Sequence, residues 1–124
     1  MNQTKAHAVL IGVDDYSTYD ASNKHNLFGC VNDVRAFWDV CVTSGFAPEN
    51  IHVLINPPLN PAELGGLAPN FKAANRANIL AEQERLVGLL GADPRAVGLL
   101  VYSGHSRAAP RAACWCSPAT TIRA

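Results

Sequence analysis

The sequence has no apolar run of the ~20 residues that are needed to cross a bilayer. Its first residues, Met-Asn-Gln-Thr-Lys, do not lead into a stretch with the features of a cleaved secretory signal. The four cysteines, Cys30, Cys41, Cys114 and Cys116, lack the spacing of a disulfide framework. We therefore expect a cytoplasmic protein with reduced thiols and no membrane partner.

The sequence also lacks a surplus of charge, because ten basic residues balance ten acidic ones. The charges are spread unevenly. The segment after His105 holds three arginines and no acid, which leaves a net charge of −3 on residues 1–105. A mildly acidic body argues against nucleic acid as a partner, since nucleic-acid binding requires a basic surface. It is compatible with a basic substrate.

Apolar patterns along the 124 residues predict one α/β domain of the order β-α-β-α-β. Buried strands are expected at about 6–13, 50–55 and 96–102, and amphipathic helices at about 29–44 and 75–90. Helices between strands imply a parallel sheet. We expect the strand order 2-1-3, in which the carboxyl ends of the first and third strands are neighbours.

Two segments show neither pattern. Residues 56–70 are rich in proline and glycine and are expected to form an exposed loop. Residues 107–124 have no β-branched run and no helical stripe, so we expect an unstructured tail after a domain that spans residues 1–106. The predicted sheet would then be incomplete, which favours a truncated or frame-shifted end over a genuine terminus.

Polar residues gather where the predicted strands end. The first strand delivers Asp14–Asp15, the third delivers Ser103 and His105, and the first helix begins with Cys30 and Asp33 on one face. In open parallel sheets this carboxyl edge is where ligands bind. The first turn of a helix keeps an aspartate ionised. Such an edge could grip a cationic side chain and place an imidazole beside it as a general base.

Four segments carry a resemblance to a known family: Ala8–Val13, Leu27–Asp33, Arg76–Leu80 and Tyr102–His105. In this order they resemble the large-subunit (p20-type) half of caspase-like cysteine peptidases of the C14 class, and metacaspases more than animal caspases. The resemblance covers about residues 5–106 and rests on Gly-Cys-x-Asn-Asp and Ser-Gly-His occurring together. It implies a partial caspase-like three-layer fold.

The resemblance also implies chemistry. Caspase-like peptidases use a Cys-His dyad, in which the histidine after Ser-Gly assists a cysteine that attacks the peptide carbonyl. His105 matches that catalytic histidine. Metacaspases cleave after arginine or lysine, and Cys30, Asp33 and Ser103 match positions that line their S1 pocket. The implied substrate is a peptide or protein with a basic residue.

The sequence departs from the family pattern in three ways. Ser106 replaces the glycine that usually follows the histidine. The Asp-x-Cys-His-Ser-Gly-like segment that carries the nucleophile is absent from the 124 residues, so we expect no activity from this chain alone. The acidic positions that bind calcium in many complete family domains are missing too, so no cofactor is expected here. No predicted strand or helix positions Cys114 or Cys116 so that either could replace the nucleophile. Together with His105 they do not provide the four ligands of a structural zinc site.

Two other functions compete with the peptidase interpretation. The chain could be a non-catalytic interaction module, or a half-domain completed by another chain. In that case the open edge of the 96–102 strand should pair with a second copy. It could also be a receiver-like phosphoacceptor domain, because Asp14–Asp15 provides an acidic pair for magnesium. Ser-Gly-His stands where that domain needs its phosphoacceptor aspartate, which argues against it.

Overall fold

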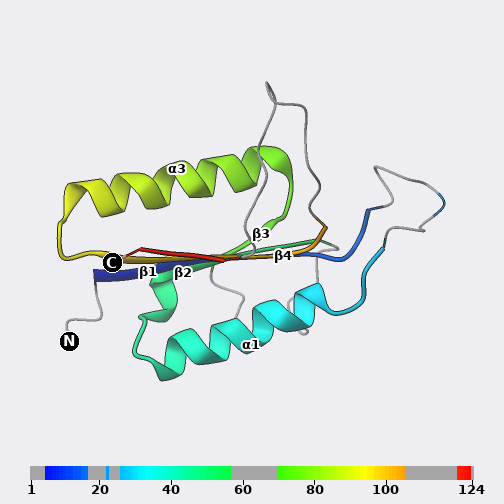
Figure 1. Cartoon of the computed structure of the whole chain (residues 1–124), viewed down its shortest axis with the longest axis horizontal. Coiled ribbons are helices and arrows are strands. Elements are labelled where there is room, and N and C mark those ends of the chain that lie inside the picture. Colours follow the sequence, from blue (N-terminus) through cyan, green and yellow to red (C-terminus); the bar gives the residue numbers. More distant parts are fainter. Residues whose placement is uncertain (1–4, 17–21, 23–25, 57–69, 106–119, 124) are drawn as a thin grey trace.

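The computed structural model describes residues 5–16, 22, 26–56, 70–105 and 120–123. Strands and helices alternate along most of this part of the chain (Figure 1). In chain order the elements are β1 (Ala6–Val13), α1 (Cys30–Thr43), the 3-10 turn η2 (Pro48–Asn50), β2 (Ile51–Asn56), β3 (Phe71–Ala73), α3 (Arg76–Ala92), β4 (Val97–Ser103) and β5 (Thr120–Arg123).

The described strands form one sheet in the order β3-β2-β1-β4-β5. β1 lies between β2 and β4 and is parallel to both, so the predicted order 2-1-3 is confirmed. Seven of the eight β1 residues are buried, all except His7, as a central strand covered on both faces requires. The carboxyl ends of β1 and β4 are therefore neighbours, with Gly12 opposite Ser103.

The two long helices cover opposite faces of this sheet (Figure 1). Alternate residues of β1 separate into two apolar clusters: Leu10 packs with the α1 side and Ile11 with the α3 side. α1 buries a stripe at helical spacing, which includes Val34 and Trp38. It ends before Gly45, whose φ of 97° places it in the left-handed region. The three layers and the α/β alternation agree with the expected fold class.

The face toward α3 contains a buried charge. Glu82 is only 1 % exposed, although it is a charged residue. Its carboxylate accepts hydrogen bonds from Lys72 Nζ at 2.7 Å and Arg85 Nε at 2.9 Å. His52 Nδ1 lies 3.0 Å from the same carboxylate. Glu82 thus joins α3 to β2 and β3 by charge, whereas Val87, an apolar residue of the same helix, is 61 % exposed.

Two short strands were not predicted. β3 follows the proline-rich loop and pairs in parallel with β2, from Phe71 opposite Val53 to Ala73 opposite Ile55. β5 lies within the expected unstructured tail and pairs antiparallel with β4 from Gly98 to Val101. The β4 edge that was expected to be open is therefore covered.

Residues 57–69, 106–119 and 124 lie outside the described residues. No helix in the described part of the chain is long and apolar enough to span a membrane.

Candidate functional site

The carboxylate of Asp14 fixes the start of α1. Asp14 directly follows β1, and its side chain accepts hydrogen bonds from the backbone N–H groups of Cys30 at 2.8 Å and Val31 at 3.2 Å. Gly29, at the N-cap position, has no side chain that could do this. Asp14, which lies outside the helix at the end of β1, therefore satisfies two of its free N–H groups and interacts favourably with the positive end of its dipole. The sequence placed Asp14 at this edge but did not identify it as a cap.

Gly12 allows α1 to approach β1 closely. A Cβ atom at this position would lie 2.7 Å from the backbone oxygen of Cys30 and 2.7 Å from Val34 Cγ2. Real Cβ atoms do not come so close to backbone atoms, so only glycine fits here without moving the helix. The first turn of α1 thus rests directly on the end of β1.

The first turn of α1 is also joined to the end of β4. The hydroxyl of Ser103 donates a hydrogen bond to Asp33 Oδ2 at 2.7 Å, across 70 residues of sequence. The Asp33 side chain remains exposed to solvent. The structure therefore brings together two of the residues that the sequence assigned to one pocket. It places a carboxylate and a hydroxyl at the carboxyl edge of the sheet.

Cys30 lies behind this pair and is buried. Burial raises the pKa of its thiol, a hydrogen bond with Ser103 partly offsets this, and the nearby carboxylate of Asp14 raises it further. A thiol in this setting is protonated at neutral pH and is a poor nucleophile. Cys41 belongs to the core, where burial raises its pKa to about 11. Neither described cysteine suits the role of an attacking thiolate.

Two tyrosines hold the backbone of His105. Its N–H donates to Tyr16 Oη at 2.6 Å, and its carbonyl oxygen accepts from Tyr102 Oη at 2.7 Å. The two hydroxyls lie 3.5 Å apart. Because the Tyr102 hydroxyl donates its proton to the carbonyl oxygen of His105, Tyr16 must be the donor between the two hydroxyls. The three hydrogen bonds therefore form a closed ring. Burial raises the pKa of Tyr102, and Tyr16 raises it further, so it stays a donor.

The imidazole of His105 is positioned by the same residues. Its ring meets the Tyr16 ring edge-on, with the centroids 4.7 Å apart, and the residue remains exposed. Gly104 must be small, since a Cβ atom there would lie 2.7 Å from Tyr16 Oη and 2.8 Å from Tyr102 Oη. Sequence reasoning missed both tyrosines. Their positions, at the end of β1 and one residue before Ser103, were the only available signal.

The described site combines an exposed carboxylate with an exposed imidazole on adjacent element ends. Asp33 can attract a cationic side chain, and His105 can accept a proton from a reacting group. Among the described residues, no three His, Cys, Asp or Glu side chains are grouped so that they could hold a metal ion. Ser106, Cys114 and Cys116 lie outside the described residues.

Comparison with known proteins agrees with this arrangement. The family model of the caspase domain (peptidase C14) matches residues 5–119. This match includes the Gly-Cys-x-Asn-Asp and Ser-Gly-His segments and therefore every residue of the site above. No curated protein sequence matches the chain significantly.

Proposed function

This chain belongs to the caspase-domain family, and we propose that it is the large-subunit half of a metacaspase-type cysteine endopeptidase that cleaves after arginine or lysine. In this proposal His105 is the catalytic general base. Cys30, Asp33 and Ser103 line the S1 pocket for the basic side chain. The nucleophilic cysteine comes from a segment that the 124 residues do not contain, so the chain alone is inactive.

The observation that carries the proposal is the 2.7 Å hydrogen bond from Ser103 to Asp33. Ser103 engages only Oδ2 of the carboxylate. A guanidinium or ammonium group that enters from solvent can then bind Oδ1 through a charge-assisted hydrogen bond. Cys30 contributes a neutral, buried wall beneath the pair, because its raised pKa keeps the thiol protonated. A negative pocket on a mildly acidic body fits a basic substrate residue.

The proposed role of His105 follows from how it is held. In a Cys-His dyad the imidazole takes the thiol proton as the sulfur attacks the substrate carbonyl, and then gives a proton to the leaving amine. Tyr16 and Tyr102 occupy the backbone N–H and carbonyl oxygen of His105. These bonds fix the turn at the end of β4, where His105 is exposed to solvent.

The pocket is tested in a chimera in which the missing strands come from a close relative with a complete domain. Asp33→Ala should lower kcat/KM for arginine and lysine substrates at least about tenfold, as expected for one charge-assisted contact. Asp39→Ala is the matched control, since Asp39 is an exposed aspartate of the same helix. Equal effects of the two substitutions would show that Asp33 is only a helix-terminus charge.

A further inference from the structure

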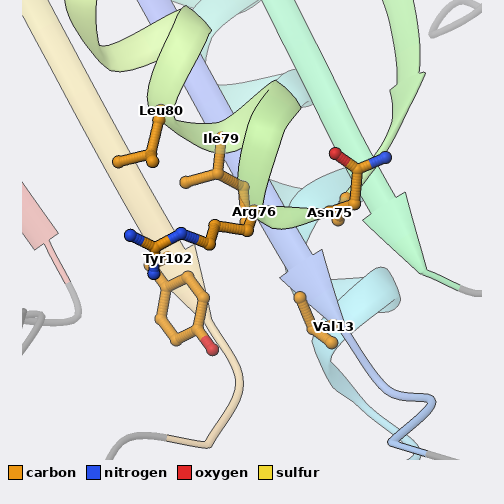
Figure 2. A pocket seen from close by; sticks show the side chains of 7 residues that line it. Val13, Asn75, Arg76, Ile79, Leu80 and Tyr102 are labelled. Atoms are coloured by element: carbon orange, nitrogen blue, oxygen red, sulfur yellow. The ribbon is translucent and has the colours of Figure 1, made fainter. Parts of the chain in front are cut away.

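A hollow lies at the carboxyl edge, on the face opposite α1 (Figure 2). It has a volume of about 360 Å³, near the lower end of the roughly 300–1,000 Å³ of small-molecule sites. Figure 2 shows Arg76, Ile79 and Leu80 of α3 across from the strand-end side chains Val13 and Tyr102. Ala74 and Asn75 complete its lining.

The lining is apolar except at one end. Arg76 is its only charged residue, and Arg76 forms no ion pair or hydrogen bond with any described residue. The amide side chain of Asn75 is already engaged, because its oxygen accepts from the N–H of Asn78 at 2.8 Å. The hollow therefore offers an apolar floor and a cation at its rim that lacks a counter-ion in the described part of the chain.

The position of Arg76 strengthens this interpretation. Arg76 is the first residue of the 17-residue helix α3, whose first turn contains no acidic residue. A cation at the positive end of a helix is unfavourable for the helix itself. An anion bound there would interact with both the guanidinium and the helix end. An arginine at this position does not stabilise the helix, but it can bind an anionic ligand.

We propose that this hollow binds the C-terminal residue of a peptide, with an apolar side chain inside and the α-carboxylate on Arg76. Its volume admits one large residue rather than an extended segment. In a C-terminal residue, the carboxylate and the side chain share one carbon, which matches a cation placed directly beside an apolar floor. The site is distinct from the Asp33 pocket, which lies on the α1 face and requires a ligand of opposite charge.

The full chain labelled with ¹⁵N is titrated with three probes and followed by the amide signals of the lining residues. N-acetyl-leucine carries both features, N-acetyl-leucinamide lacks the charge, and acetate lacks the apolar body. We expect N-acetyl-leucine to bind at least about tenfold more tightly than either of the others, the effect of losing one charge-assisted contact. Equal affinity for the amide, or no shift of the lining signals, would overturn the proposal.

Two pocket variants and one control test whether the carboxylate of N-acetyl-leucine binds at Arg76. Arg76→Gln should weaken N-acetyl-leucine binding about tenfold, whereas Arg35→Gln, an exposed arginine of α1 on the opposite face, should leave it unchanged. Leu80→Glu places a carboxylate one helical turn from Arg76, where it competes for the guanidinium, and it should weaken binding without destabilising the exposed first turn. Unchanged binding in both pocket variants refutes the site.

A fourth probe separates a chain end from an acidic side chain. In acetyl-aspartyl-leucinamide the carboxylate belongs to an internal residue. Weaker binding than N-acetyl-leucine supports recognition of a C-terminus, while equal or tighter binding overturns it. None of these measurements depends on peptidase activity, so failure here leaves the proposed function untouched.

Discussion

At the scale of single residues, the least expected feature is Glu82. Burial alone would raise the pKa of this carboxyl, but hydrogen bonds from Lys72 and Arg85 and the proximity of His52 outweigh it and hold the pKa at about 2. Its ordinary value is 4.5. A carboxyl with a lowered folded pKa stabilises the fold fully above pH 4.5, and this contribution is lost as the pH falls toward 2.

The two histidines near Glu82, His7 and His52, also make the fold less stable as the pH falls. Burial, followed by the charge of Arg85, lowers the pKa of both His7 and His52 below 6.5. The fold therefore favours their neutral forms, and the stability that this provides is complete above pH 6.5 and is lost as the pH falls below it. Acidification should destabilise the protein in two phases, the histidines first and Glu82 second.

We predict that Glu82→Gln lowers the free energy of unfolding by about 2–3 kcal/mol at pH 7. Breaking a fully buried ion pair costs ~3–5 kcal/mol, and the value here is smaller because Lys72 and Arg85 are partly exposed. The substitution should also remove the contribution of Glu82 to the pH dependence between pH 4.5 and 2. Urea unfolding across a pH series measures both, with Glu84→Gln, an exposed carboxylate of the same helix, as the control. An unaltered acid phase in Glu82→Gln would contradict the assignment.

Sequence patterns identified some of these residues and not others. The sequence placed Cys30, Asp33, Ser103 and His105 at the carboxyl edge because each lies at a strand end or in a first helical turn, and their roles came only from the resemblance. Glu82 could not be found, since its burial depends on Lys72 of β3, a strand too short to carry a pattern of its own.

At the scale of elements, the site depends on how closely α1 rests on β1. Asp14 and Gly12 control this contact, one by capping the helix and the other by leaving room for it. The strands and helices with long apolar patterns were predicted within a few residues of their observed bounds. β3 and β5 were not, because three- and four-residue strands are specified by their neighbours in the sheet rather than by local sequence.

We predict that Gly12→Ala lowers the free energy of unfolding by about 1–3 kcal/mol, the range for overpacking a core. The new methyl group would meet the backbone of α1, so the helix must shift and Asp33 must move relative to Ser103. Chemical denaturation measures the loss, and the NMR signals of Asp33 and Ser103 report the shift.

The matched control is Gly88→Ala in the interior of α3. Apart from its chain neighbours and the nearby backbone of α3 itself, no heavy atom lies within 4 Å of a Cβ atom placed there, so alanine should stabilise the helix by roughly 0.5–1 kcal/mol. The two Gly→Ala substitutions are thus expected to have opposite signs. A neutral Gly12→Ala would mean that α1 does not need its close contact with β1.

At the scale of the whole molecule, the carboxyl edge carries chemistry on both sides of the sheet. Asp33 lies on the α1 side and Arg76 on the α3 side, with the turn of His105 between them at the end of β4. If both proposals hold, a peptide that crosses this edge would meet the carboxylate of Asp33 on one face and the guanidinium of Arg76 on the other. The division follows from a parallel sheet with one helix starting at the same edge on each face.

We predict that the 124-residue chain alone does not hydrolyse arginine- or lysine-directed fluorogenic peptides, with or without calcium. The two described cysteines are buried with raised pKa values, and the family's nucleophile segment is absent from the sequence. Continuous fluorescence assays measure this. Turnover that Cys114→Ala or Cys116→Ala abolishes would prove the prediction wrong, and turnover that survives both would indicate a contaminating peptidase.

The remaining prediction concerns the edge of the sheet. β5 covers β4 from Gly98 to Val101, although the sequence suggested an open edge there. Removing residues 107–124 would leave one side of β4 without its backbone hydrogen bonds, and an unpaired strand of this kind recruits another chain. We predict that the shortened chain self-associates with rising concentration and that the 124-residue chain does so less.

Sedimentation velocity under reducing conditions compares the two chains and keeps the cysteines from contributing cross-links. A synthetic peptide of residues 117–124 should return the shortened chain to the smaller species, because it can replace β5 on β4. If both chains remain monomers, the β4 edge is not adhesive. If both associate equally and the peptide has no effect, association uses another surface, such as the outer edge of β3. Only a difference that the peptide reverses assigns to β5 the role of closing the sheet.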